Sequence, residues 1–109
     1  MLNDGKALGE QVVPADFVED MYSQPPDATW PYEPGEGLEP FYRSFWWGYG
    51  NEEGDLGGYG IHGQLLRVAP EADIVISMYS TWPRADGDGE NDYWGMSDAL
   101  MDALIAHFR

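Results

Sequence analysis

The sequence predicts an α+β fold: an antiparallel sheet of about three strands, with an N-terminal helix, a long Pro-rich loop and a C-terminal helix packed on the sheet. Apolar residues recur at helical spacing near both ends of the chain, and runs rich in β-branched and aromatic residues lie between them. The 109 residues suffice for one small domain. We divide this domain into a helix and loop over 1–40 and the strands and second helix over 41–109.

The N-terminal helix is predicted to begin at Pro14, because proline fits the first helical position, and Asp16 lies near the positive end of the helix. Three apolar residues would form its buried side: Phe17, Val18 and Met21. Repeated prolines then interrupt residues 24–40, which predicts a loop rather than a helix or a central strand. Trp30 and Tyr32 in this loop are expected to pin it to the domain, although they would also suit a binding surface.

Three strands are predicted in the centre of the chain. The aromatic-rich run 41–50 is predicted to form one strand, and 63–69 and 73–80 are predicted to form a hairpin. Apolar groups on both faces of the last strand predict that the sheet is covered on both sides. A sheet of three strands would have unpaired edges and a large apolar face, which indicates neighbours outside this chain.

The C-terminal helix follows a long acidic loop. Its apolar residues recur at helical spacing: Met96, Leu100, Met101, Leu104, Ile105 and Phe108. This pattern predicts an amphipathic helix that packs on the sheet through these residues, with Asp98 and Asp102 on its solvent side.

The chain is strongly acidic, because 20 Asp and Glu residues against 5 Lys and Arg give a formal net charge of -15 at pH 7. Such a field repels phosphate backbones, so no nucleic-acid partner is expected. No apolar stretch is long enough to cross a bilayer and the first residues do not resemble a signal peptide, so no membrane partner is expected and the cytoplasm is slightly favoured. The absence of cysteine excludes disulfides and zinc–thiolate sites.

Acidic residues alternate in the loop before the C-terminal helix: Asp86, Asp88, Glu90 and Asp92. A helix–loop–helix calcium site needs glycine at its sixth position and glutamate at its twelfth. Counted from Asp86, those positions hold Asn91 and Ser97. We therefore predict a solvated loop, and we expect no metal and no other cofactor.

The residues for nucleophilic catalysis are incomplete. An S-x-x-K motif needs a serine three residues before a lysine, but Asn3 stands three residues before Lys6, the sole lysine. Tyr49 opens a Y-x-N sequence like that of serine–lysine enzymes, yet so short a match favours a structural tyrosine. A lone histidine at the start of a strand, His62, is typical of hydrogen-bonded scaffolding more often than of an acid–base group.

A glycine-rich run, Gly60–Gln64, stands between other recognisable motifs. These are a tryptophan pair, a hairpin around a proline and a serine-x-tryptophan-proline sequence: Trp46, Trp47, Pro70, Ser80, Trp82 and Pro83. On these motifs the chain resembles the C-terminal part of the β-lactamase-related serine hydrolases, which share the class C β-lactamase and penicillin-binding-protein fold. It is most similar to the 6-aminohexanoate-dimer (nylon-oligomer) hydrolases. The resemblance implies that residues 1–109 are the C-terminal portion of one serine hydrolase domain, with a partial β-lactamase/transpeptidase-like fold.

The resemblance also implies where a site would lie. In that family the glycine-rich strand lines the active-site cleft, and one of its backbone N–H groups forms the oxyanion hole with that of the nucleophilic serine. By motif position, the resemblance assigns this catalytic N–H to Ile61. A donor of this kind typically contributes roughly 3 kcal/mol to transition-state stabilisation. Gly60, His62 and Gly63 are then expected to border the substrate, and Asp86 matches a loop carboxylate near it.

The same resemblance implies what this chain lacks. The family's serine, lysine and tyrosine lie upstream of the matched segment, so the chain is expected to be inactive alone, with the missing N-terminal portion of the fold as a partner. No counterpart of the class C strand lysine is present, which favours ester or linear amide substrates over β-lactams. Two other classes of function stay open: a small non-catalytic binding module, and a subunit that completes another chain's sheet.

Overall fold

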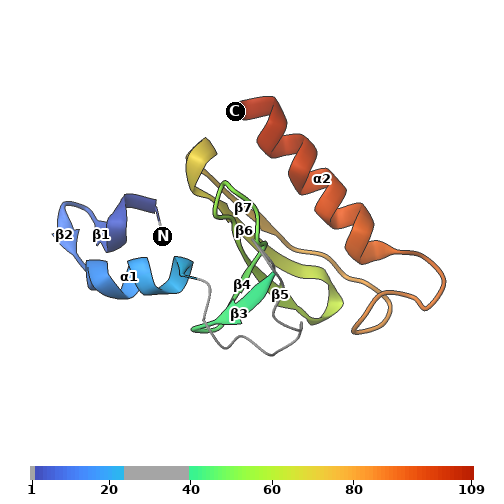
Figure 1. The fold of residues 1–109 in the computed structure, drawn as a ribbon. Helices are drawn as coiled ribbons and strands as arrows, with labels where there is room; N and C mark the ends of the chain where they lie inside the picture. Colours follow the sequence, from blue (N-terminus) through green and yellow to red (C-terminus); the bar gives the residue numbers. More distant parts are fainter. Residues whose placement is uncertain (1, 24–39) are drawn as a thin grey trace.

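A computed structural model describes residues 2–23 and 40–109. Trp30, Tyr32 and nearly all of the Pro-rich loop predicted over 24–40 lie outside these residues. The described chain forms a five-stranded antiparallel sheet, a small two-stranded ribbon and two α-helices (Figure 1). The α+β class is therefore confirmed, and the predicted strand count of about three is wrong.

The five strands follow one another in the sheet in chain order, each antiparallel to the next. They are β3 (Phe41–Arg43), β4 (Trp46–Gly48), β5 (Leu56–Gly60), β6 (Gln64–Ala69) and β7 (Ile74–Met78). The predicted hairpin of 63–69 and 73–80 is confirmed, because Leu65 pairs with Met78 and Ala69 with Ile74.

Two strands were missed for different physical reasons. The run 41–50 folds back on itself at Ser44 and Phe45, whose φ angles are 51° and 68°. Such two-residue hairpin turns favour Gly, Asn or Asp, so this sequence carries no ordinary signal for one. Residues 56–60 contain three glycines, which weaken strand propensity, and yet they pair along their whole length with β6.

The N-terminal segment forms a short turn of 3₁₀ type (Leu2–Gly5), the ribbon of β1 (Lys6–Ala7) and β2 (Glu10–Gln11), and α1 (Ala15–Tyr22). The helix begins at Ala15, one residue after the predicted start at Pro14, which caps the helix instead of forming its first position. Its inner face joins the buried core of the sheet, a cluster of Met21, Phe41, Leu56 and Val68. An ion pair between Asp20 and Arg43 ties the same helix to β3.

The C-terminal helix α2 (Tyr93–Phe108) is capped by Asp92, whose carboxylate accepts a hydrogen bond from the Gly95 N–H at 2.9 Å. Of the six apolar residues predicted to pack on the sheet, two are buried and four are exposed: Met101 and Ile105, against Met96, Leu100, Leu104 and Phe108.

The placement of Asp98 on the solvent side of α2 is wrong, whereas Asp102 is exposed as predicted, although it also pairs with Arg67. Asp98 lies 3.2 Å from the hydroxyl oxygens of Tyr49 and Tyr59, and Asp102 pairs with Arg67 at 2.5 Å. Both carboxylates have partners on or beside the sheet, Asp98 the two tyrosine hydroxyl groups and Asp102 the guanidinium of Arg67, and helical spacing alone does not encode these partners.

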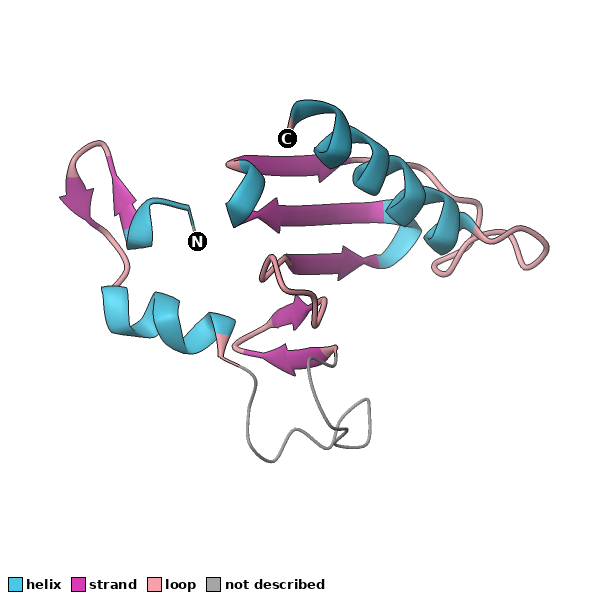
Figure 2. Ribbon diagram, turned by 45° about the horizontal axis from the view of Figure 1, so that its top comes forward, coloured by secondary structure: helices cyan, strands magenta, loops and turns pink. Residues whose placement is uncertain are grey.

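The two helices cover opposite faces of the sheet. Val68 meets the cluster that contains Met21 of α1, and its neighbour Arg67 meets Asp102 of α2. Figure 1 shows the N-terminal segment and α2 on opposite sides of the sheet, and Figure 2 shows α2 running across the end of the sheet that β6 and β7 form. The prediction that both faces of the last strand are covered is wrong, because Val75 is 53% exposed in β7. No helix within 2–23 and 40–109 combines the length and the apolar character needed to cross a membrane.

Candidate functional site

One edge of β5 is only partly paired. Pairs with β4 are formed at Leu56 and Gly57 and end there, whereas β6 pairs with β5 as far as Gly60. The chain then turns through Ile61–Gly63 into β6. Beyond Gly57 this strand therefore presents a glycine-rich edge that β4 does not cover, leading into an exposed turn.

The loop after β7 is fastened to this turn through His62. The His62 N–H donates to the Ala85 carbonyl at 2.9 Å, and the Trp82 N–H donates to the His62 carbonyl at 3.3 Å. The imidazole Nδ1 lies 2.8 Å from the Trp82 carbonyl oxygen, and Gln64 Nε2 donates to the Ser80 carbonyl at 2.7 Å. His62 is thus hydrogen-bonded scaffolding, with a φ angle of 58°.

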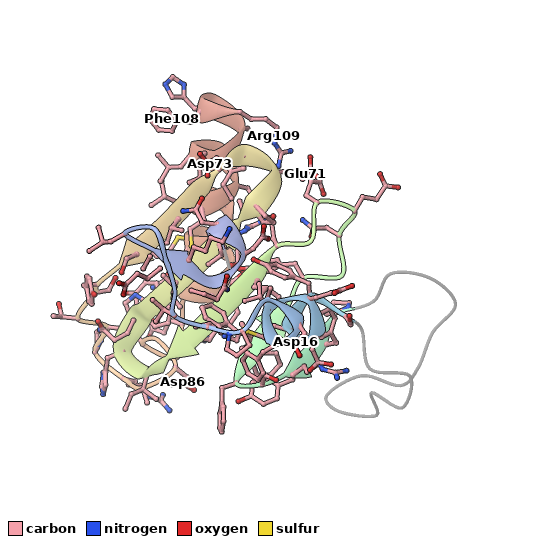
Figure 3. The ribbon with its side chains drawn as sticks, turned by 90° about the vertical axis from the view of Figure 1, so that its left-hand side faces the viewer. Asp16, Glu71, Asp73, Asp86, Phe108 and Arg109 are labelled. Carbon is pink, nitrogen blue, oxygen red and sulfur yellow. The ribbon has the colours of Figure 1, made fainter. Side chains whose placement is uncertain are left out.

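This fastening brings the sequence-predicted site residues to one end of the sheet. Ile61 is 67% exposed at the tip of the turn, next to His62, and Asp86 follows directly on Ala85. The Asp86 carboxylate is exposed, with Oδ1 3.7 Å from Nε of Arg84. Figure 3 places Asp86 at the opposite end of the molecule from Phe108 and Arg109, the last residues of the chain.

Two glycines of the run are required by the chain's own aromatic side chains. A Cβ at Gly63, where φ is +79°, would stand 2.5 Å from Cε2 of Trp82, and one at Gly57 would stand 2.9 Å from Cε2 of Tyr49. By contrast, a Cβ at Gly58 would meet nothing closer than Leu66 at 3.6 Å. A Cβ at Gly60 would stand 3.1 Å from Cβ and from the carbonyl oxygen of Gln64, so the expectation of a close ligand rests most on Gly58, along the edge that β4 does not pair.

A polar cluster beside this edge was missed by the sequence reasoning. The Tyr49 and Tyr59 hydroxyl oxygens lie 2.5 Å apart, and each lies 3.2 Å from Oδ1 of Asp98. Burial, followed by the bond to Tyr59, raises the pKa of Tyr49 well above its usual range, and burial raises the pKa of Tyr59 to about 12. The alternation of β5 and the helical spacing of α2 gave no signal that these residues meet.

Arg67 lies next to the cluster, and the positive charge of Arg67 is paired with two aspartates outside the cluster. Its guanidinium binds Asp55 at 2.7 Å and Asp102 at 2.5 Å, and Cζ lies 4.1 Å from the ring centroid of Tyr49. Although burial lowers the pKa of Arg67, the hydrogen bond to Asp55 and the other favourable contacts outweigh it and raise that pKa. Tyr49 is thus packed as a structural residue.

The acidic loop uses its carboxylates internally. Asp88 accepts hydrogen bonds from the backbone N–H groups of Glu90 and Asn91 at 2.8 Å each and from the Asn91 side chain at 2.7 Å. These bonds lower the pKa of Asp88 well below its usual range. In the part of the chain that the structure describes, no group of three or more His, Cys, Asp or Glu residues is arranged to hold a metal ion.

In sequence and in fold, the chain is similar to one part of a class of hydrolases. It is 38% identical over 104 residues to the 6-aminohexanoate-dimer hydrolase of Paenarthrobacter ureafaciens, a match that covers 93% of this chain and 26% of that enzyme. It also superposes on a solved Bacillus anthracis protein named "Putative 6-aminohexanoate-dimer hydrolase" with a TM-score of 0.74 and 25% identity, covering 96% of this chain and 25% of that one. No protein-family model matches the chain.

The predicted resemblance to 6-aminohexanoate-dimer hydrolases is therefore confirmed, and the chain corresponds to a fragment of such a protein. It spans about a quarter of the length of these two relatives.

Proposed function

We propose that this chain supplies the oxyanion-hole strand of a serine hydrolase that cleaves ester or linear amide bonds. The observation that carries the proposal is the edge of β5, which β4 leaves unpaired after Gly57 and which runs through Gly58 and Gly60 to the exposed Ile61. Among the turn and loop hydrogen bonds of the described residues, none engages the Ile61 N–H. A backbone donor held in a rigid turn is suited to an acyl oxygen that becomes negatively charged in the transition state.

In this proposal each predicted site residue has a distinct task. Ile61 donates its N–H to the acyl oxygen, while Gly60 and Gly58 let the substrate lie against the backbone. His62 and Gly63 hold the turn in place through the Trp82–Ala85 segment. The exposed carboxylate of Asp86 is positioned to contact a polar part of the substrate.

The chain does not supply the attacking group. With Asn3 three residues before Lys6, there is no S-x-x-K sequence, so the nucleophile has to come from the part of the fold that these residues do not match. The chain alone is expected to be inactive, and its partner in catalysis is that remaining part of the hydrolase fold.

The test grafts this chain into the Paenarthrobacter enzyme in place of the segment that it matches and follows hydrolysis of a nitrophenyl ester. Ile61→Pro removes the N–H donor together with the isoleucine side chain, and Gly60 has the extended φ and ψ of -111° and 157° that a following proline requires. We expect Ile61→Pro to lower kcat by about 10²–10³-fold. Ile61→Ala, the matched control, keeps the N–H and should retain kcat.

The proposal fails if Ile61→Pro and Ile61→Ala have equal kcat in a folded chimera. It also fails if the isolated chain hydrolyses the ester faster than buffer.

A second candidate function is a subunit that completes the sheet of another chain. The outer edge of β7 carries no neighbouring strand among the described residues, Tyr79 just beyond it is 82% exposed, and the outer stripe of α2 is apolar. Exposed strand edges and apolar stripes of this kind favour association. Sedimentation of the chain alone distinguishes the two functions, because a chain that pairs through this edge should contain little monomer.

A further inference from the structure

A cavity of about 450 Å³ opens between the sheet and the first turns of α2. It is lined by Pro40, Trp47, Gly48, Tyr49, Tyr59, Trp94 and Asp98. Three of its walls are aromatic rings: the Tyr59 ring centroid lies 6.2 Å from that of Trp47, in an edge-to-face arrangement, and 5.7 Å from that of Trp94, in a tilted one. Of the described residues that line the cavity, Asp98 is the one whose side chain carries a formal charge.

No basic side chain neutralises Asp98. The four arginines pair with other acids: Arg43 with Asp20, Arg67 with Asp55 and Asp102, Arg84 with Asp86, and Arg109 with Glu53. None of the ion pairs within 2–23 and 40–109 includes Asp98, and residues 24–39 contain no lysine or arginine.

The tyrosines fix the Asp98 carboxylate without cancelling its charge. Their hydroxyl groups cluster at Oδ1, and no hydrogen bond of the described residues involves Oδ2. A negative charge at the wall of an aromatic cavity combines two attractions for one type of ligand, because ring faces also attract cations. A strongly hydrated metal ion gains little from aromatic walls, whereas an alkylammonium group fits both the size and the chemistry.

We propose that this cavity is a binding site for a small organic cation, with Asp98 as counter-ion and Trp47, Tyr59 and Trp94 as the surrounding cage. The site goes beyond the proposed hydrolase function and does not depend on it. It lies on the face of the sheet that α2 covers, and it shares Tyr59 with the strand that leads to Ile61.

The test titrates the chain with choline and with its neutral carbon isostere, dimethylbutanol, at physiological ionic strength, by two-dimensional ¹H–¹⁵N NMR. Choline should produce saturable chemical-shift changes at Gly48 and Trp94. Dimethylbutanol should bind at least about tenfold more weakly than choline. Asp98→Asn should abolish this preference, while Asp102→Asn, the same charge change one turn along α2, should preserve it.

Trp94→Leu provides a second variant and should weaken choline binding without altering the overall spectrum. Three results would each overturn the proposal: equal affinity for choline and dimethylbutanol, shifts spread over the acidic surface as expected for counter-ion condensation, or equal losses in the two aspartate variants.

Discussion

Replacement of Asp55 by alanine tests how much of the fold depends on one buried ion pair. Asp55 ends the turn before β5, and its Oδ2 accepts hydrogen bonds from Nε and Nη2 of Arg67 in β6 at 3.1 and 2.7 Å. The side chains are 1% and 7% exposed, respectively. The pair therefore joins two central strands in a region from which water is excluded.

The free energy of unfolding that Asp55→Ala should lose can be estimated from measurements on other buried ion pairs. Removing one partner of a buried ion pair typically destabilises a protein by about 3–5 kcal/mol, because the other charge stays buried. Two features place Asp55→Ala near the lower end: Arg67 keeps its bond to Asp102, and Oδ1 of Asp55 is buried without a partner, so the native pair is itself incompletely satisfied. We expect a loss of about 3 kcal/mol, which is a large share of the roughly 5–15 kcal/mol that stabilises an ordinary domain.

Urea unfolding followed by circular dichroism measures this loss. The matched control is Asp102→Ala, which removes the exposed partner of the same guanidinium and should cost about 1 kcal/mol or less. A double variant, Asp55→Leu with Arg67→Met, should recover most of the stability lost in Asp55→Ala, since a buried pair can be replaced by apolar residues at little cost. Equal losses in Asp55→Ala and Asp102→Ala would refute the reasoning.

Two other predictions concern the turn and the tyrosines. Gly63→Ala should destabilise the fold by at least about 1 kcal/mol in thermal unfolding, because φ is +79° there and the Cβ would meet Trp82. The control Gly58→Ala should be nearly neutral, and similar melting temperatures for the two variants would contradict the prediction. Raising the pH above about 10 should lower stability, because the unfolded chain releases its tyrosine protons near that value while the raised pKa of about 12 keeps Tyr59 protonated in the folded state. Urea midpoints between about pH 8 and 11 measure this loss of stability. Tyr59→Phe should make the loss smaller, whereas Tyr79→Phe, at an exposed position, should leave it unchanged. A urea midpoint that does not change with pH in the unsubstituted chain would contradict the prediction.

Much of the fold could be predicted from sequence because the signals were local. Pro14 marked the beginning of α1, the pair of apolar runs marked the β6–β7 hairpin, and the apolar spacing marked α2. The turn at Ser44 and Phe45 was missed because backbone pairing overrides the usual preference for glycine at positive φ.

The candidate site was likewise predictable where its signal is local and not where it depends on contacts between distant residues. The run Gly60–Gln64 was recognisable as a motif. In the structure, however, Gly63 has to be glycine because the Trp82 side chain packs against it, and no local pattern encodes that contact. The rotation of α2 was equally hidden. Helical periodicity indicates which residues share a face, but it does not show that Asp102 would meet Arg67 on a different element.

The proposed function also offers an explanation for the outward apolar stripe of α2. Leu100, Leu104 and Phe108 of this helix are exposed among the described residues, and isolated small domains seldom tolerate so contiguous an apolar surface. About three quarters of each relative's length has no counterpart in this chain. Under the proposed function, the remaining part of the hydrolase fold would bring the nucleophile, and the same part would cover this stripe and the edge of β7 that has no neighbouring strand among the described residues.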